Sequence, residues 1–98
     1  FHIKTAWHGP ADISPIAHLA NLHLDFAVAN FGIQEFAQFP AEVEEVFKGG
    51  PEFEAGYLKI SDKPGLGCEV DEEAAAKYPY QKAYLPVAES LDGSVHEW

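Results

Sequence analysis

Two short motifs carry the side chains of this sequence that could do chemistry. His8 stands before a Gly-Pro turn with Asp12 just beyond it, and Glu35 closes the segment Asn-Phe-Gly-Ile-Gln-Glu at residues 30–35. An imidazole can donate, accept or transfer a proton near neutral pH, and a carboxylate can bind a cation or a hydroxyl group. Each motif follows an apolar, strand-like stretch, and parallel barrels carry their active-site groups at the carboxyl ends of their strands. The two motifs therefore indicate part of an active site.

The same side chains also have ordinary structural interpretations. His8 could be an exposed loop histidine or could bind a carbonyl group. Asp12 lies two residues before Ser14 and could help to cap a helix. Glu35 could pair with a cation instead of facing a cleft. Position in the sequence alone leaves these alternatives open.

The remaining candidate metal ligands do not form a zinc motif. His18 and His23 are five residues apart, whereas zinc-binding histidines on a helix usually stand four apart, on one face. We therefore expect both to be structural. With Cys68 as the single cysteine and no compact cluster of histidines and carboxylates, neither a self-contained zinc site nor an internal disulfide is expected.

The first 38 residues have the pattern of a strand, a helix and a second strand. Apolar and polar residues alternate over residues 1–7, which predicts a strand. Ser14 followed by Pro15 is a typical helix start, and residues 16–27 are apolar almost all round. Residues 28–36 then predict a second strand. The helix needs cover on more than one side, which a free-standing domain of this size would struggle to provide.

The character of the chain changes near Pro40. A short acidic helix is expected over residues 41–47, a strand, turn and strand around Gly56 over residues 53–60, and a loop over residues 61–67. Residues 71–77 predict one or two helical turns, and the rest is expected to be largely irregular. The sequence thus divides into an α/β barrel portion, residues 1–38, and an extension, residues 39–98, that wraps over something else.

Composition excludes several classes of function. The net charge is −10 with only six Lys and Arg residues, which argues against binding to nucleic acid or to an anionic membrane surface. No apolar run approaches the roughly 20 residues that span a bilayer, and a cytoplasmic location is the expectation. The 98 residues are too few for a closed barrel of about 250 residues. The chain also begins in mid-pattern, so we expect it to be the back of a longer polypeptide.

The order of motifs resembles a known family. The motifs are His-Gly-Pro-Ala-Asp-Ile-Ser-Pro at 8–15, Asn-Phe-Gly-Ile-Gln-Glu at 30–35, Pro-Gly-Leu-Gly at 64–67, Asp-Glu-Glu at 71–73, Ala-Lys-Tyr-Pro-Tyr at 76–80, Tyr-Leu-Pro-Val at 84–87 and the closing Asp-Gly-Ser-Val-His-Glu-Trp. Together they resemble the carboxy-terminal quarter of the mannonate dehydratase family of the enolase superfamily. That family includes mannonate and gluconate dehydratases and starvation-sensing-type proteins.

The resemblance implies a fold and a reaction. The fold is a (β/α)₇β barrel capped by an α+β domain, to which this chain contributes the last two strands, the helix between them and a tail that packs on the cap. The reaction is the Mg²⁺-dependent dehydration of D-mannonate, D-gluconate or both to a 2-keto-3-deoxy sugar acid. In the family a base removes the proton next to the substrate carboxylate, and the metal stabilises the resulting enediolate.

The resemblance also assigns roles to residues of this chain. His8, Asp12, Glu35 and Trp98 match substrate-contacting positions, and Pro10 matches a position where proline accompanies weak, gluconate-using or inactive members. The catalytic base and the Mg²⁺ ligands match positions upstream of this chain, so it should be inactive alone. A homo-oligomer is expected.

Three alternatives remain beside this interpretation. They are a non-catalytic or very weakly active homologue, a stand-alone acidic α+β interaction module, and a small metal-dependent hydrolase that uses the histidines.

Overall fold

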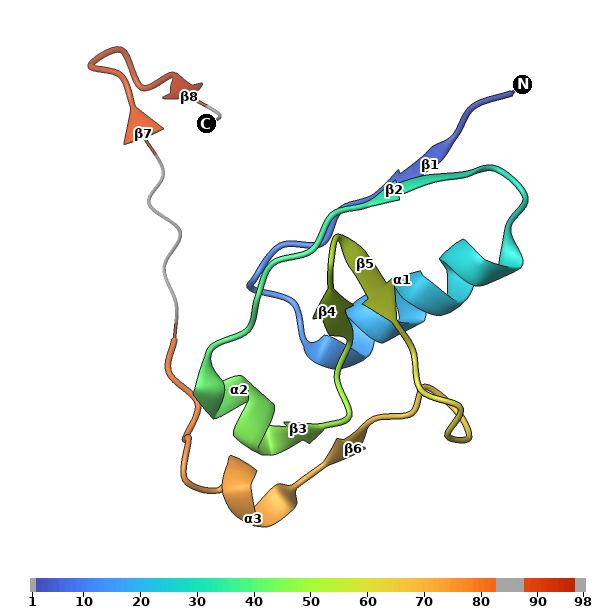
Figure 1. Cartoon of the computed structure of the whole chain (residues 1–98). Helices are drawn as coiled ribbons and strands as arrows, with labels where there is room; N and C mark the ends of the chain where they lie inside the picture. Colours follow the sequence, from blue (N-terminus) through green and yellow to red (C-terminus); the bar gives the residue numbers. More distant parts are fainter. Residues whose placement is uncertain (1, 83–87, 97–98) are drawn as a thin grey trace.

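The first structural unit is a parallel pair of strands joined by a helix. The computed structural model describes residues 2–82 and 88–96, and in Figure 1 strands β1 (Thr5–Trp7) and β2 (Phe31–Gln34) lie side by side above helix α1 (Pro15–Ala27). The two strands pair in parallel, as expected of a βαβ unit. The α/β prediction is thus confirmed, although both strands are shorter than the expected residues 1–7 and 28–36.

The pairing of β1 with β2 is irregular at one point. Thr5 is opposite Phe31, but Ala6 is opposite Ile33, so the register shifts at Gly32. A Cβ atom on Gly32 would lie 2.7 Å from the carbonyl oxygen of Thr5. Only glycine lets the backbones approach this closely, and the extra residue forms a bulge that bends the ladder.

Helix α1 begins as the sequence predicts and packs beneath the strands. Ser14 is the N-cap, its side chain accepts a hydrogen bond from the amide of Ala17, and Pro15 takes the first helical turn. Leu19 and Leu22 are buried, while Phe26, on the same face near the end of the helix, is 70% exposed. The helix therefore has an apolar surface that the described residues leave partly uncovered.

The middle of the chain forms short elements that pack on one another. Helix α2 (Ala41–Val46) ends one residue earlier than expected, because Phe47 begins strand β3 (Phe47–Lys48), which pairs antiparallel with β6 (Glu69–Val70). Helix α3 (Glu72–Ala75) is capped by Asp71 and is shorter than the expected residues 71–77. Glu45 joins the two helices by accepting hydrogen bonds from Lys77 Nζ at 2.5 Å and Tyr78 Oη at 2.6 Å. These two bonds hold the pKa of Glu45 below its usual range.

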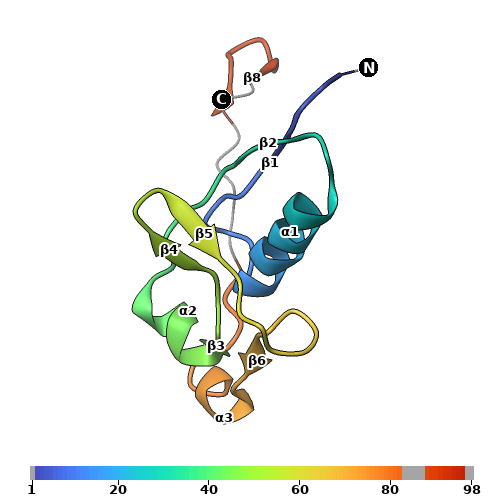
Figure 2. The same cartoon turned by 45° about the vertical axis from the view of Figure 1, so that its right-hand side comes forward.

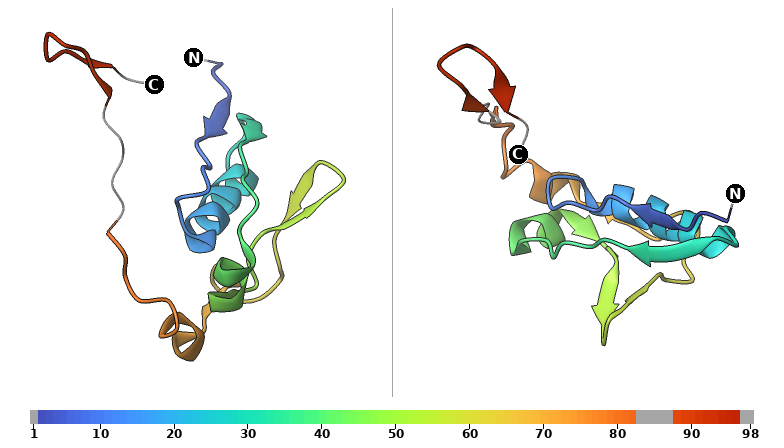
Figure 3. Two further views of the ribbon diagram at one scale, coloured as in Figure 1. Left: turned by 90° about the vertical axis from the view of Figure 1, so that its left-hand side faces the viewer. Right: turned by 90° about the horizontal axis from the view of Figure 1, so that it is seen from above.

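Two hairpins complete the described elements. Strands β4 (Glu52–Glu54) and β5 (Tyr57–Lys59) form the hairpin expected around Gly56, with φ of 51° at Ala55 and 85° at Gly56. Two consecutive positive φ angles are typical of the tight turn that suits strand twist. Strands β7 (Ala88–Glu89) and β8 (Val95–His96), of two residues each, form a second hairpin within the end of the chain that was expected to be largely irregular. This hairpin lies away from β1, β2 and α1 (Figures 1 and 3).

The chain buries few apolar side chains for its length. Within residues 2–82 and 88–96 the buried apolar side chains are Leu19, Leu22, Val46 and Ala74. The radius of gyration is 17.0 Å, against about 13 Å for a compact domain of this length. Figure 2 shows the same open arrangement, with the β4–β5 hairpin beside α1 and the β3–β6 pair below it. No helix among the described residues is long and apolar enough to cross a membrane.

The N-cap of α1 yields a testable prediction. Replacing Ser14 with alanine should lower the free energy of unfolding, measured by urea denaturation of the purified protein, by about 0.5–1 kcal/mol. The loss is at the small end of the range because the Ser14 Oγ to Ala17 N distance is 3.4 Å, and the Ser14 carbonyl already accepts from the same amide at 3.0 Å. Ser14→Asp keeps an acceptor and should match the unaltered protein. Equal stability of the alanine variant and the unaltered protein would show that the side chain does not cap the helix.

Candidate functional site

The ends of the two parallel strands meet in a small polar cluster. His8 follows β1 directly and Glu35 follows β2 directly. His8 Nδ1 lies 2.9 Å from Glu35 Oε2, and the same oxygen accepts a hydrogen bond from the amide of Gly9 at 2.8 Å. We call His8, Gly9 and Glu35 the strand-end cluster. The structure thus brings together two of the residues that the sequence singled out.

Close backbone packing fixes the geometry of the strand-end cluster. Gly9 is buried, and a Cβ atom on it would overlap the carbonyl oxygen of Glu35 and lie 2.8 Å from the carbonyl carbon. Gln34 adds a second connection, because its Nε2 donates to the Glu35 carbonyl at 2.6 Å and reaches the Trp7 carbonyl at 3.4 Å. The chain segments after β1 and after β2 are therefore held in contact by glycine at one point and by an amide side chain at another.

The strand-end cluster faces an open hollow rather than a closed cavity. A depression of about 420 Å³ is lined by the side chains at these strand ends, from Ala6, Trp7, His8, Ile33, Gln34 and Glu35. The side chains of His8 and Glu35 are 78% and 56% exposed. Because Gly9 and His8 occupy Glu35 Oε2, Glu35 Oε1 is the oxygen that can accept a hydrogen bond from a hydroxyl group. His8 Nε2 can accept or donate a hydrogen bond according to its protonation state. The arrangement suits a ligand that carries several hydroxyl groups.

The other residues predicted from the family resemblance have different positions. Asp12 is exposed in the loop between β1 and α1, and among the described residues no hydrogen bond or ion pair joins it to His8 or Glu35. The N-cap role considered for Asp12 belongs to Ser14. Pro10 is half-buried in the same loop. Trp98 lies outside the described residues, so its contact with the substrate stays a prediction.

Two contributors to the site were not assigned a role in it from sequence. Gly9 contributes a backbone amide, and any residue but proline has one, so residue type gave no signal beyond the turn. His18 was expected to be structural, and it is 1% exposed, with Nε2 3.1 Å from the carbonyl oxygen of Pro10. The signal that could have marked His18 is a histidine one turn into an otherwise apolar helix, directly after the Gly-Pro loop.

The described residues do not form a metal site. No group of three or more His, Cys, Asp or Glu side chains in residues 2–82 and 88–96 is arranged to hold a metal ion. The strand-end cluster supplies one carboxylate and one imidazole, which is too few ligands for Mg²⁺, an ion that demands near-octahedral oxygen coordination. Residues 2–82 and 88–96 by themselves therefore do not fit the ion that the family resemblance implies.

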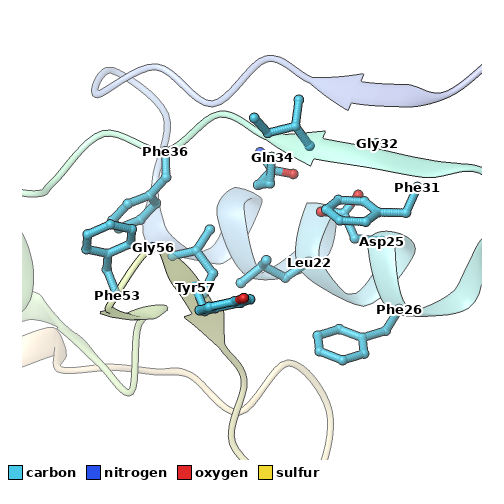
Figure 4. Close-up of a pocket in the computed structure, with 12 residues that line it drawn as sticks. Leu22, Asp25, Phe26, Phe31, Gly32, Gln34, Phe36, Phe53, Gly56 and Tyr57 are labelled. Atoms are coloured by element: carbon cyan, nitrogen blue, oxygen red, sulfur yellow. The ribbon is translucent and has the colours of Figure 1, made fainter.

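A second hollow, also beside β2, is apolar. This apolar groove, about 400 Å³, lies between α1, β2 and the β4–β5 hairpin, with the aromatic rings of Phe36 and Phe53 stacked at one end (Figure 4). Asp25 lines it and is 8% exposed. Burial raises the pKa of the Asp25 carboxyl, and the Trp7 side chain acts in the opposite direction. That contact falls short of hydrogen-bond geometry, so desolvation dominates.

The topology and the site define a class before any relative is considered. A parallel βαβ unit is the building unit of α/β proteins, and their functional groups stand where these polar side chains do, at the carboxyl ends of the strands. Residues 1–74 match the family described as "Enolase C-terminal domain-like". The chain belongs to this family, as its motifs predict.

Similar proteins agree on the family and are much longer than this chain. It is 49% identical over 98 residues to a D-galactonate dehydratase family member of Pseudarthrobacter chlorophenolicus, covering 100% of this chain and 24% of that protein. It is 45% identical over 97 residues to a D-mannonate dehydratase of Caulobacter vibrioides, with 99% and 24% covered. The chain thus spans about a quarter of the length of these relatives.

A solved structure supports the same fold. The crystal structure of an enolase from Pantoea ananatis with bound D-gluconate and Mg is similar to this chain with a TM-score of 0.78 and 50% sequence identity. The match covers 82% of this chain and 19% of that one. The predicted fold class, part of an enolase-superfamily barrel, is confirmed.

The contact between Gly9 and Glu35 can be tested by adding one methyl group. Gly9→Ala should lower the free energy of unfolding by about 1–3 kcal/mol, because the new Cβ atom collides with backbone rather than with a flexible side chain. Urea denaturation followed by circular dichroism measures the change.

Gly50→Ala is the matched control. Its new Cβ atom would lie 3.5 Å from Pro15 Cβ, an ordinary contact, and a change within about 0.5 kcal/mol is expected. If the two alanine variants were equally stable, the close packing of Gly9 on Glu35 would be wrong.

Proposed function

We propose that this chain is the carboxy-terminal part of a longer sugar-acid dehydratase and that it supplies substrate-binding residues. The observation that carries the proposal is the strand-end cluster, which joins the ends of two parallel strands in a chain whose relatives are named sugar-acid dehydratases. The reaction removes a proton from C2 and the hydroxyl group from C3 of an aldonic acid as water, and the product is a 2-keto-3-deoxy acid. The sequence of the complete protein beyond residues 1–98 would supply the base.

In this proposal the strand-end cluster binds and orients the substrate. A sugar acid carries a carboxylate and a row of hydroxyl groups, each of which can donate and accept hydrogen bonds. Glu35 Oε1 accepts from a hydroxyl group, and His8 Nε2 pairs with a neighbouring one. Because the Gly9 amide and His8 hold Glu35 Oε2, the carboxylate is oriented before the substrate arrives. Such preorganisation reduces the entropy lost on binding.

The other sequence-based assignments stay proposals. Asp12 binds the substrate from its loop, Trp98 closes the pocket, and Pro10 favours D-gluconate over D-mannonate. The Pantoea ananatis structure with D-gluconate, at 50% identity, supports the choice of this substrate class. Residues 1–38 belong to the barrel and residues 39–98 to an extension that packs on a capping domain. We further propose a homo-oligomer in the cytoplasm.

Mg²⁺ is proposed for the complete protein and not for this chain. The Pantoea ananatis enolase is described with bound Mg, whereas the described residues of this chain offer no cluster that could hold the ion. Its ligands are therefore assigned to preceding barrel strands. The chain alone is accordingly expected to have no dehydratase activity.

The exposed apolar surface favours this proposal over a stand-alone module. Ile3, Phe26 and Ile33 are 71%, 70% and 68% exposed, and all three lie on or beside the βαβ unit. In a barrel, neighbouring strands and helices cover the apolar side chains of such a unit. A free-standing domain would leave these side chains in water.

The proposal predicts the effect of neutralising Glu35 in the complete protein. With D-gluconate and Mg²⁺, Glu35→Gln should lower kcat/KM by about 10- to 150-fold, the factor that corresponds to losing hydrogen bonds to a charged group worth about 1.5–3 kcal/mol. Formation of the 2-keto-3-deoxy acid, measured as its semicarbazone, reports the rate.

Glu52→Gln, in the exposed β4 strand, is the matched control and should stay within about twofold of the unaltered protein. Equal activity of the two glutamine variants would remove Glu35 from the substrate site. If the unaltered protein formed no product from D-gluconate, D-mannonate or related acids, a non-catalytic homologue would be the better conclusion.

A further inference from the structure

The most enclosed polar side chain of the βαβ unit is His18, on α1. It is 1% exposed, although neither the proposed substrate contacts nor the helix cap involve it. Two aromatic rings stand nearly perpendicular to it, with centroid distances of 5.4 Å to Phe36 and 5.0 Å to Phe39 and interplanar angles of 87° and 90°. Both rings belong to the segment that follows Glu35. The imidazole thus lies between α1 and the chain leaving β2.

A single hydrogen bond connects this imidazole with the loop that follows β1. His18 Nε2 lies 3.1 Å from the carbonyl oxygen of Pro10, which can only accept, so Nε2 carries the proton. Nδ1 is buried and has no hydrogen-bond partner among the described residues. Among the described residues, Nε2 is therefore the ring nitrogen that anchors His18.

The contacts of His18 converge on the strand-end cluster. Its Cε1 would lie 3.0 Å from a Cβ atom on Gly9, so the ring abuts the residue whose amide holds Glu35. Asn21, one turn further along α1, brings Nδ2 to 3.5 Å from the His8 carbonyl, a weak second link from the same helix face. The helix therefore holds the loop after β1 through backbone carbonyls, and His18 makes the shorter bond.

We infer that His18 is a positioning residue that fixes the Gly9–Pro10 turn by donating to the Pro10 carbonyl, and so sets where His8 and Glu35 present themselves to the substrate. The effect on sugar acids rests on the proposed function, but the effect on the turn does not. The competing explanation is that His18 only fills space between α1 and the two phenylalanine rings. The two explanations differ in whether the donor matters.

Three variants of the complete protein separate donor from volume. His18→Gln keeps an N–H donor at nearly the reach of Nε2, His18→Leu keeps apolar volume without a donor, and His18→Asn is polar but too short to reach Pro10. His23→Leu is the control on the same helix, because among the described residues its Nε2 is buried without a hydrogen-bond partner. Two readouts are taken from each variant: hydrogen–deuterium exchange of a peptide covering residues 8–13, and kcat and KM for D-gluconate.

The inference predicts a specific pattern. His18→Leu should speed exchange at residues 8–13 about tenfold or more and raise KM by about tenfold, with kcat changed less than about threefold, because the cluster holds the substrate in its ground state. His18→Gln and His23→Leu should stay close to the unaltered protein in both readouts. If His18→Leu does not fold, His18→Asn against His18→Gln gives the same comparison.

Two results would overturn the inference: unchanged exchange and KM in His18→Leu, or equal impairment of the leucine and glutamine variants, which would mean that volume and not the donor matters. Failure of the proposed function looks different. In that case the unaltered protein has no activity, and the exchange pattern alone still decides whether His18 positions the turn.

Discussion

The local structure depends on one carboxylate oxygen that is shared between two strands. Glu35 Oε2 accepts the Gly9 amide at 2.8 Å and faces His8 Nδ1 at 2.9 Å, so the residue after β2 is fastened to the two residues after β1. This contact requires parallel strands whose ends are level, and it requires glycine at position 9. The helix between the strands, the bulge at Gly32 and the amide of Gln34 all serve to bring those ends together.

The energetics of the described residues indicate that their stability depends on the protein that surrounds them. Hydrophobic burial is the main favourable contribution to folding, and within the described residues it is concentrated in a few side chains such as Leu19 and Leu22 of α1. The apolar groove contains a buried, desolvated carboxyl at Asp25. In the complete protein we expect neighbouring barrel elements to cover this surface, in line with relatives about four times as long.

Local signals made part of this structure predictable. Ser14 and Pro15 marked the start of α1, and Gly56 marked the β4–β5 turn, because capping and positive φ depend on residues a few positions apart. Phe47 was predicted to end a helix, but it pairs with Val70 in a strand. This pairing depends on a residue 23 positions away, so local sequence does not indicate it. The pairing of His8 with Glu35 could be predicted only because strand ends in a parallel sheet share an edge. The hydrogen bond from His18 to the Pro10 carbonyl could not be predicted, because helical spacing indicates which face a residue is on but not which carbonyl it contacts.

The central claim is that the strand-end cluster holds the substrate. It is tested most directly by a crystal structure of the complete protein with D-gluconate and Mg²⁺. The account predicts a hydroxyl or carboxylate oxygen of the sugar acid within about 3.2 Å of Glu35 Oε1 or His8 Nε2, while Glu35 Oε2 keeps its bond to the Gly9 amide. A sugar acid bound in the barrel with no atom within about 4 Å of either side chain would contradict it.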